Sequence, residues 1–275
     1  MINISDQQLL QFRDFIFNAC GLWFSDSKIL ILTNRLKARM KALNITDPAR
    51  YFSSISDPDD RAELATLINL ITTNETYFYR CEAQMETFSK IILPEITKEK
   101  LARKDRRLRI WSAGCSTGEE PYTIAICVQE AMPFHNIWDI SITATDISTE
   151  VLSKAIEAKY AQRAVSRIPE DILNKYFNVR DGLHILKDET KSLVDFEYSN
   201  LVDAVFETGF DVIFCRNVLI YFRDETKAQM LDKFYHSLAD GGYLFLGPSE
   251  MVRGLVQGFR MIVTKDAVVF RKEPK

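Results

Sequence analysis

Beyond residue 107, short apolar segments alternate with longer amphipathic ones, and this alternation constrains the fold more than any other feature. The short segments have strand length, whereas apolar residues in the longer segments recur at helical spacing. Three strand and helix pairs of this kind are 108–113 with 121–131, 140–145 with 149–158, and 210–214 with 224–238. Because strands that alternate with helices form parallel sheets, the sequence predicts an α/β fold with helices flanking the sheet.

The first part of the chain shows helical spacing and no strand alternation. Helices are predicted over 5–20 and 26–43, with Gly21 as the stop between them. Another helix is predicted to begin at Asp47-Pro48, because proline suits the first helical turn. The sequence therefore predicts an all-α domain over 1–75.

A charged segment follows this domain. Residues 97–107 contain few apolar side chains, which is typical of an exposed helix end or a linker. We therefore expect a linker helix and a charged linker over 76–107. The α/β domain would then span 108–275.

The alternating pattern is interrupted once within the α/β domain. Strand-like 183–186 and 194–198 lie close together, with Asp181-Gly182 as a turn before the first of them. This predicts a small antiparallel β-subdomain inserted at about 160–199.

The chain closes with two strand-like segments, 259–264 and 267–272, around Lys265-Asp266. They predict a hairpin that adds antiparallel strands to a mostly parallel sheet. This is the arrangement of the class I S-adenosylmethionine methyltransferases, which have a Rossmann-like sheet.

Composition excludes several classes of protein. The net charge of −3 argues against a general nucleic-acid coat, and no apolar run approaches the length of a membrane span. The start of the chain shows no basic segment followed by an apolar one, so no signal peptide is expected. Five cysteines without a Cys-x-x-Cys pair are typical of reduced thiols in a cytoplasmic protein, and three scattered histidines argue against a metal site.

Residues 111–122 form the first of two segments that could carry chemistry. The segment leaves a strand and enters a turn in which Gly114 and Gly118 let the backbone approach a ligand closely. Glu119 is well placed to meet a cation, such as the sulfonium or ammonium of S-adenosylmethionine. Since the Gly-x-Gly-x-x-Gly spacing is missing, we expect a nucleoside ligand without a cradled pyrophosphate. An ordinary strand-to-helix turn is the alternative.

Two further strand ends carry polar residues. Asp146 ends the second strand, where an acid typically accepts hydrogen bonds from ribose hydroxyls, although it could instead cap the following helix. Asn200-Leu201 follows another strand, and an amide with an apolar neighbour suits the edge and face of an adenine. Asparagine is also common in turns, so this second indication is weak alone.

Residues 214–222 form the second chemical segment. An arginine at the end of a buried strand is costly unless it meets a carboxylate of the substrate or of the protein, so Arg216, with Asn217, is a candidate site residue. Tyr221 could orient the acceptor through its hydroxyl, or it could be a half-buried aromatic residue. Cys215 is interpreted as a small buried residue because no histidine lies nearby in sequence.

Polar residues also interrupt the helical pattern at 72–80, between the two domains. They could simply cap helices. Alternatively, they form a lid that contributes Asn74, Thr76 and Arg80 to the site.

The predicted helix over 26–43 carries a basic stripe in an acidic protein. Arg35 and Arg39 lie on it, Lys37 adds charge further round, and no acid interrupts them. Such a stripe is either a docking surface for an acidic partner or a solvated helix face.

These segments together closely resemble the CheR family, the bacterial chemoreceptor glutamate methyltransferases. Residues 73–80 (TNETYFYR), 116–122 (STGEEPY) and 214–222 (FCRNVLIYF) match the family's motifs in the family's order. The resemblance covers nearly the whole chain. It implies S-adenosylmethionine binding through Asn74, Thr76, Arg80, Glu119, Asp146, Asn200, Leu201, Arg216 and Asn217.

The resemblance also implies an activity and a partner. The reaction would be transfer of a methyl group from S-adenosylmethionine to receptor glutamate carboxylates, with Tyr221 and Arg216 orienting acceptor or cofactor and with no metal. The helical domain would face the cytoplasmic helical part of chemoreceptors through Arg35, Lys37 and Arg39. We expect a cytoplasmic monomer that neither enters a membrane nor binds nucleic acid.

One departure from the family pattern concerns the small β-subdomain. Some members use a longer loop there to bind a receptor's carboxyl-terminal pentapeptide, whereas 176–183 is short, so we expect a tether-independent enzyme.

Other acceptors are disfavoured by the turn after the central strand. The sequence there lacks the Asn/Asp-Pro-Pro-aromatic signature of adenine methylation. It offers Arg216 where a protein-arginine methyltransferase would need a pair of acids to bind a guanidinium acceptor. A non-catalytic, cofactor-sensing interaction module is the alternative of a different class.

Overall fold

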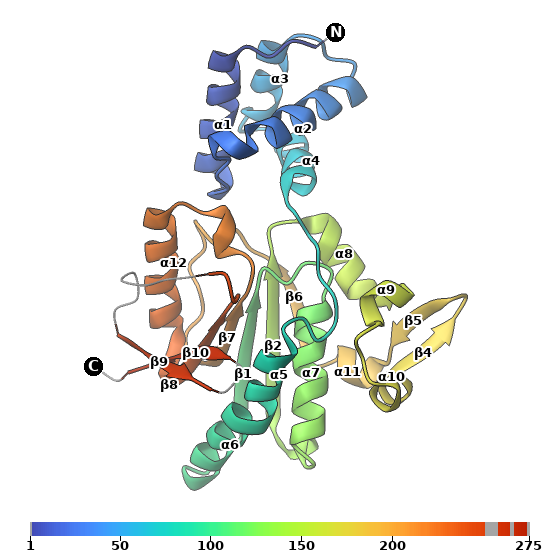
Figure 1. Ribbon diagram of the computed structural model, residues 1–275, viewed down its shortest axis with the longest axis vertical. Coiled ribbons are helices and arrows are strands. Elements are labelled where there is room, and N and C mark those ends of the chain that lie inside the picture. The colour runs from blue at the N-terminus through green and yellow to red at the C-terminus, as the bar shows by residue number, and fades with distance from the viewer. Residues whose placement is uncertain (1, 251–257, 265–266, 274–275) are drawn as a thin grey trace.

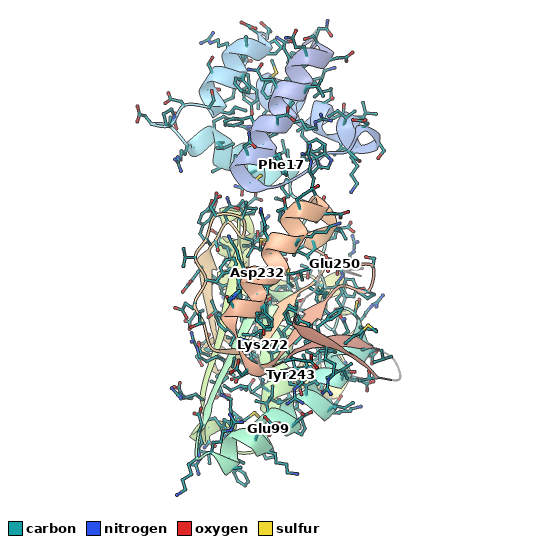
Figure 2. The ribbon with its side chains drawn as sticks, turned by 90° about the vertical axis from the view of Figure 1, so that its left-hand side faces the viewer. Phe17, Glu99, Asp232, Tyr243, Glu250 and Lys272 are labelled. Atoms are coloured by element: carbon teal, nitrogen blue, oxygen red, sulfur yellow. The ribbon has the colours of Figure 1, made fainter. Side chains whose placement is uncertain are left out.

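The computed structural model describes residues 2–250, 258–264 and 267–273. A bundle of helices stands over one end of a sheet domain, and the sheet carries a small β-subdomain at its side (Figure 1). Figure 2 shows the same two stacked parts from the side, with Phe17 at the lower end of the helical bundle. The predicted fold class is confirmed.

The larger sheet has seven strands among the described residues, in the order β6-β2-β1-β7-β8-β10-β9. They are β1 (Arg107–Ala113), β2 (Asp139–Asp146), β6 (Val194–Tyr198), β7 (Phe210–Cys215), β8 (Leu238–Leu246), β9 (Phe259–Val263) and β10 (Val268–Lys272). The pairs β6–β2, β2–β1, β1–β7 and β7–β8 are parallel, and β10 is antiparallel to both neighbours. This is the predicted closing hairpin, although its tip at Lys265-Asp266 lies outside the described residues.

Alternate residues of β7 pack in two separate hydrophobic cores, because successive side chains of a strand point to opposite faces of the sheet. Val212 and Phe214 pack in one core with α7 (Glu119–Ala131), and Ile213 packs in the other with α12 (Asp224–Ser237). Every residue of β7 is buried, as expected for a central parallel strand covered on both faces.

Residues 76–107 are not a linker, contrary to the sequence-based prediction. They contain α5 (Glu82–Thr87), the π-helical segment η2 (Phe88–Ile92) and α6 (Leu93–Ala102). Phe88 and Leu93 are fully buried in the core of the sheet domain, and the ring centroids of Phe88 and Phe214 lie 5.3 Å apart. The charge pattern of 97–107 misled the prediction because it describes only the outer side of helices whose inner side packs on the sheet.

The helical domain contains only helices among its described residues, as predicted. They are α1 (Asp6–Cys20), the 3-10 helix η1 (Asp26–Lys28), α2 (Ile29–Ala42), α3 (Pro48–Ile55) and α4 (Ala62–Ile71). Ser5 caps α1 with a capping box, and Asp47 caps α3. Gly21 ends α1 in the left-handed conformation, with φ of 75°.

The small β-subdomain is narrower than predicted. It consists of β3 (Lys159–Tyr160), β4 (Phe177–Arg180) and β5 (Leu183–Leu186), with α9 (Gln162–Val165), α10 (Glu170–Tyr176) and α11 (Asp188–Lys191) nearby. The predicted strand at 194–198 belongs to the larger sheet instead, because β6 pairs in parallel with β2. The boundary of about 199 is therefore wrong. The two-residue turn at Asp181-Gly182 is confirmed by two positive φ angles.

Candidate active site

A pocket of about 390 Å³ lies between the helical domain and the sheet. Its sheet side is formed by residues that follow β1, β2, β6 and β7, at the carboxyl ends of the parallel strands. Open α/β sheets bind ligands at this edge, and the volume is within the range of small-molecule sites. The helical domain contributes Leu22, Trp23, Lys28 and Ile31, among others, and the strand ends contribute Gly114, Ser116, Asp146 and Asn217.

All of the predicted catalytic and cofactor-binding residues except Glu119 line this pocket. They are Asn74, Thr76, Arg80, Asp146, Asn200, Leu201, Arg216, Asn217 and Tyr221. Residues from the segment between the domains and from the ends of β2, β6 and β7 are therefore brought to one cavity.

The turn after β1 is held close to its neighbours. Gly114 has a φ of 80°, and a Cβ atom added to it would lie 2.4 Å from the side chain of Val218, so only glycine fits. The backbone N–H of Gly114 donates to the Thr145 carbonyl at 2.8 Å, which ties this turn to β2. The Ser116 hydroxyl donates to the Asn74 carbonyl at 3.0 Å and so connects the turn to the segment between the domains.

Asp146 is fixed by the backbone around it. Its Oδ2 accepts from the Ser116 N–H at 2.8 Å, and its Oδ1 accepts from the Ser148 N–H at 2.9 Å. Burial raises the pKa of the Asp146 carboxyl, and these backbone bonds oppose that rise. The hydroxyl of Ser148, which accepts from the Val151 N–H, caps α8 (Thr149–Glu157), so Asp146 is not needed as the cap.

Glu120 is among the residues that line the pocket, whereas the predicted Glu119 is not. Glu119 is buried, and its Oε2 accepts from the Thr117 hydroxyl at 2.7 Å. Burial raises the pKa of the Glu119 carboxyl. Glu120 lines the pocket and accepts from Ser112 Oγ and from Arg216 Nε, both at 2.7 Å. Two adjacent glutamates in the sequence gave no signal of which one would face inward.

Arg216 meets a carboxylate of the protein. Its side chain is 2 % exposed and pairs with Glu120, and its Nη1 donates to the Arg80 carbonyl at 2.7 Å and to Gln84 Oε1 at 3.1 Å. Gln84 in turn donates to the Leu246 carbonyl at 2.7 Å. Sequence reasoning missed Gln84, because it lies in the segment interpreted as a linker.

Asn200 joins the two domains. Its amide nitrogen donates to the Ala19 carbonyl at 3.0 Å and to Asp203 Oδ2 at 2.8 Å, which uses both amide hydrogens. In this structure those hydrogens are therefore not available to an adenine edge. Leu201 beside it is buried and offers an apolar surface to the pocket.

The loop after β7 carries Asn217 and Tyr221. Asn217 has a left-handed backbone with φ of 61°, and its Oδ1 is buried without a hydrogen-bond partner among the described residues. The Tyr221 carbonyl accepts from the Trp23 N–H at 2.9 Å, and the ammonium of Lys28 lies 5.8 Å from the centre of the Tyr221 ring. Asn217 and Tyr221 thus both line the cavity, while the Asn217 Oδ1 itself is buried.

The basic stripe on α2 is partly used inside the helical domain. Arg39 donates to Glu63 twice, from Nε at 2.9 Å and from Nη2 at 2.6 Å, and the Tyr51 hydroxyl also donates to Glu63. These bonds to Glu63 raise the pKa of Arg39 further above its usual range. Arg35 is exposed, whereas Lys37 is part-buried. The statement that no acid interrupts the stripe holds along α2, but Glu63 reaches Arg39 from α4.

Two family models together match nearly the whole chain. The model described as CheR methyltransferase, all-alpha domain, matches residues 7–72, and the model described as CheR methyltransferase, SAM binding domain, matches residues 74–268. The chain belongs to the CheR methyltransferase family. The S-adenosylmethionine-binding domain thus includes α5 and α6, in agreement with their packing on the sheet.

Similar curated relatives carry related names. A chemotaxis protein methyltransferase of Borreliella burgdorferi is 36% identical over 257 residues, which cover 92% of this chain and 91% of the relative. Chemotaxis protein methyltransferase 2 of Vibrio cholerae is 38% identical, over 90% of this chain and 87% of the relative. A chemotaxis protein methyltransferase of Vibrio parahaemolyticus is 34% identical over 98% of both chains.

The described residues hold neither a metal-binding cluster nor a membrane-spanning helix. They contain no group of three or more His, Cys, Asp or Glu side chains that could hold a metal ion. Over the same ranges, every helix is too short or too polar to cross a membrane.

Proposed function

We propose that this protein transfers the methyl group of S-adenosylmethionine to glutamate side-chain carboxylates of chemoreceptors. The products are glutamate methyl esters and S-adenosylhomocysteine, and the reaction serves adaptation in chemotaxis. The observation that carries the proposal is the pocket at the carboxyl ends of the strands, which combines the Asp146 carboxylate with Asn217 and Tyr221 and is covered by the helical domain. Membership of the CheR family supports the same activity.

The residues present fit the proposed cofactor. The Asp146 carboxylate is positioned to accept hydrogen bonds from ribose hydroxyls. Asn217 lines the pocket and its side-chain Oδ1 is buried without a partner among the described residues, so its amide is the polar group of this loop that we assign to the cofactor. Leu201 supplies an apolar contact for a base, and Asn74, Thr76 and Arg80 border the opposite side.

The chemistry requires positioning more than proton transfer. S-adenosylmethionine, when bound, supplies a methyl group on a positively charged sulfur that a carboxylate oxygen can attack directly. A glutamate with a pKa of about 4.3 is ionised at neutral pH, so the protein needs no general base. The residues of the pocket therefore orient the acceptor and exclude water.

Arg216 suits this requirement because its charge is already paired. Opposite charges on sulfur and carboxylate fade as the methyl group moves, so an arginine that gripped the acceptor tightly would stabilise the ground state more than the transition state. Arg216 instead donates to the Glu120 carboxylate and to the Arg80 carbonyl, and it lines the pocket. We assign the orientation of the acceptor to Tyr221.

The receptor is proposed to dock on the helical domain. Arg35 is the strongest candidate, with Lys37 further round the same helix, because Arg39 is already bound to Glu63. The two-residue turn between β4 and β5 leaves little loop for a carboxyl-terminal pentapeptide, so we propose a tether-independent enzyme. We further propose that it acts as a cytoplasmic monomer without a metal ion.

Methyl-labelled S-adenosylmethionine tests the proposal. The purified protein is incubated with chemoreceptor-rich membranes, and the receptors are then treated with mild base, which hydrolyses carboxyl methyl esters. We expect base-labile label with the wild type and with Asp195→Ala, an exposed aspartate on β6, and none with Asp146→Ala. Cofactor binding without labile label would favour the cofactor-sensing module instead.

A further inference from the structure

Glu250 is a buried acid that the proposed reaction does not use. It follows β8, is 8 % exposed, and Figure 2 places it at the upper end of the sheet domain, on the side of the helical domain. Its Oε2 accepts from the Asn217 N–H at 2.9 Å and from the Gly247 N–H at 2.6 Å, and its Oε1 accepts from the Ile220 N–H at 3.3 Å. The carboxylate therefore holds backbone of the loops after both β7 and β8.

The loop after β7 borders the pocket, whereas Glu250 is not among the residues that line it. Asn217, Ile220 and Tyr221 all line the cavity. Any effect of Glu250 on a ligand must then pass through the backbone that it binds.

The charge of Glu250 is balanced by backbone dipoles. Burial raises the pKa of its carboxyl, and hydrogen bonds from Gly247, Asn217, Ile220 and Leu219 act in the opposite direction. Without the carboxylate, the N–H groups of buried loop backbone would lose their acceptor, which is costly in a protein interior.

Gly247 lies close to both partners of this interaction. A Cβ atom added to Gly247 would lie 2.7 Å from Glu250 Oε2 and 2.9 Å from the Asn217 nitrogen. Asn217 has a left-handed backbone, which asparagine adopts more readily than most other non-glycine residues, and its Oδ1 is buried without a hydrogen-bond partner among the described residues. The Glu250 carboxylate anchors this residue by accepting from its N–H.

We propose that Glu250 is a positioning residue of the methyltransferase site, whose carboxylate fixes the backbone of 217–220 and thereby sets the places of Asn217 and Tyr221 at the pocket. The proposal rests on the proposed function, because it assigns Asn217 and Tyr221 to that site. It predicts that loss of the carboxylate impairs the site without removing any group that touches a ligand.

The first test measures S-adenosylhomocysteine affinity by calorimetry in Glu250→Gln. The amide cannot accept from all of these N–H groups, so we expect affinity to fall about tenfold, the equivalent of one lost charge-assisted bond. Glu157→Gln, at an exposed glutamate on α8, is the matched control and should bind as the wild type does. Unchanged affinity in a folded Glu250→Gln protein would overturn the proposal.

A double-mutant cycle separates positioning from general stabilisation. If Glu250 acts through Asn217, then Glu250→Gln should lower affinity by less than about threefold when Asn217→Ala is already present. If the double variant lost affinity by the product of the two single-variant factors, Glu250 would not act through Asn217, which would contradict the proposal.

Gly247→Ala provides a second variant that keeps the carboxylate. Its added methyl group displaces Glu250 or the Asn217 backbone, so affinity should fall although no charge is lost. If both variants lose cooperative thermal unfolding, Glu250 holds the fold as a whole and the assignment to the site is overturned. Because binding is measured without receptor, failure of receptor methylation alone would count against the proposed function and not against this inference.

Discussion

The two walls of the pocket differ in how their polar groups are bound. On the sheet side, Asp146 and Arg216 are buried and each makes several hydrogen bonds within the chain. On the helical side, Lys28 lines the pocket with its ammonium 5.8 Å from the centre of the Tyr221 ring, and Arg35 is exposed on α2, outside the lining of the pocket. A prearranged wall suits a small ligand of fixed shape, whereas an exposed basic wall suits a macromolecular partner.

The walls are joined through the end of α1. The Trp23 ring lies 3.4 Å from the Arg223 guanidinium carbon and 4.3 Å from that of Arg13, and the Trp23 N–H donates to the Tyr221 carbonyl. Asn200 adds a bond to the Ala19 carbonyl. The helical domain is therefore packed against the loops that carry the candidate acceptor residues.

The largest expected effect comes from breaking the ion pair of the sheet wall. Glu120→Ala leaves the Arg216 guanidinium buried without its counter-charge and should destabilise the protein by about 3–5 kcal/mol. Glu63→Ala removes the corresponding partner of Arg39, whose side chain is 20% exposed, and should cost about 1–2 kcal/mol. Urea unfolding of both variants measures the difference, and an equal or reversed order would contradict the contrast between the walls.

The next effect concerns cofactor affinity on the sheet wall. Asp146→Asn keeps the size of the side chain but places an amide where two backbone N–H groups donate, and it weakens acceptance from ribose hydroxyls. We expect S-adenosylhomocysteine to bind about 10- to 100-fold more weakly in calorimetry. Asp195→Asn is the control, and a variant of Asp146 that binds normally would show that this carboxylate does not hold the ligand.

A smaller effect is expected on the helical wall. Arg35→Ala should raise the KM for receptor membranes about fivefold, because one exposed charge contributes modestly to docking. Affinity for S-adenosylhomocysteine should not change. Lys41→Ala, at another exposed cation of α2, is the matched control. A change in cofactor affinity with Arg35→Ala would contradict the assignment of cofactor binding to the sheet side alone.

The smallest expected effect is a dependence of cofactor affinity on pH. Burial raises the pKa of Asp146, so its carboxylate takes up a proton at a higher pH than a free aspartate does. The protonated form is the poorer acceptor, so affinity should fall, by about threefold, as the pH drops from 7 toward the raised pKa. Calorimetry at several pH values should show this fall in the wild type and not in Asp146→Asn.

The sequence predicted the site residues whose positions follow from the strand end or turn that carries them. Asp146 could be placed because polar residues at the ends of parallel strands meet at one edge, and Gly114 because a tight turn requires it. Glu120 and Gln84 could not be found as partners of Arg216, because three distant segments meet only in the folded chain. Patterning along one segment carries no information about such pairings.

The same limit explains the errors in the fold. Residues 76–107 were predicted to be a linker because many of them are charged. Their packing instead depends on the apolar side chains of the segment, which include Phe88. The contacts of Arg39 with Glu63 and of Asn200 with the Ala19 carbonyl could not be foreseen for the same reason, because each joins residues of different helices or domains.

The central claim is that the sheet wall binds the cofactor and the helical wall binds the receptor. Calorimetric titration of S-adenosylhomocysteine into Asp146→Ala and Arg35→Glu, both without receptor, tests it most directly. The account predicts that Asp146→Ala loses most of its affinity while Arg35→Glu binds as the wild type does. Equal affinity in Asp146→Ala, or a comparable loss in Arg35→Glu, would contradict it.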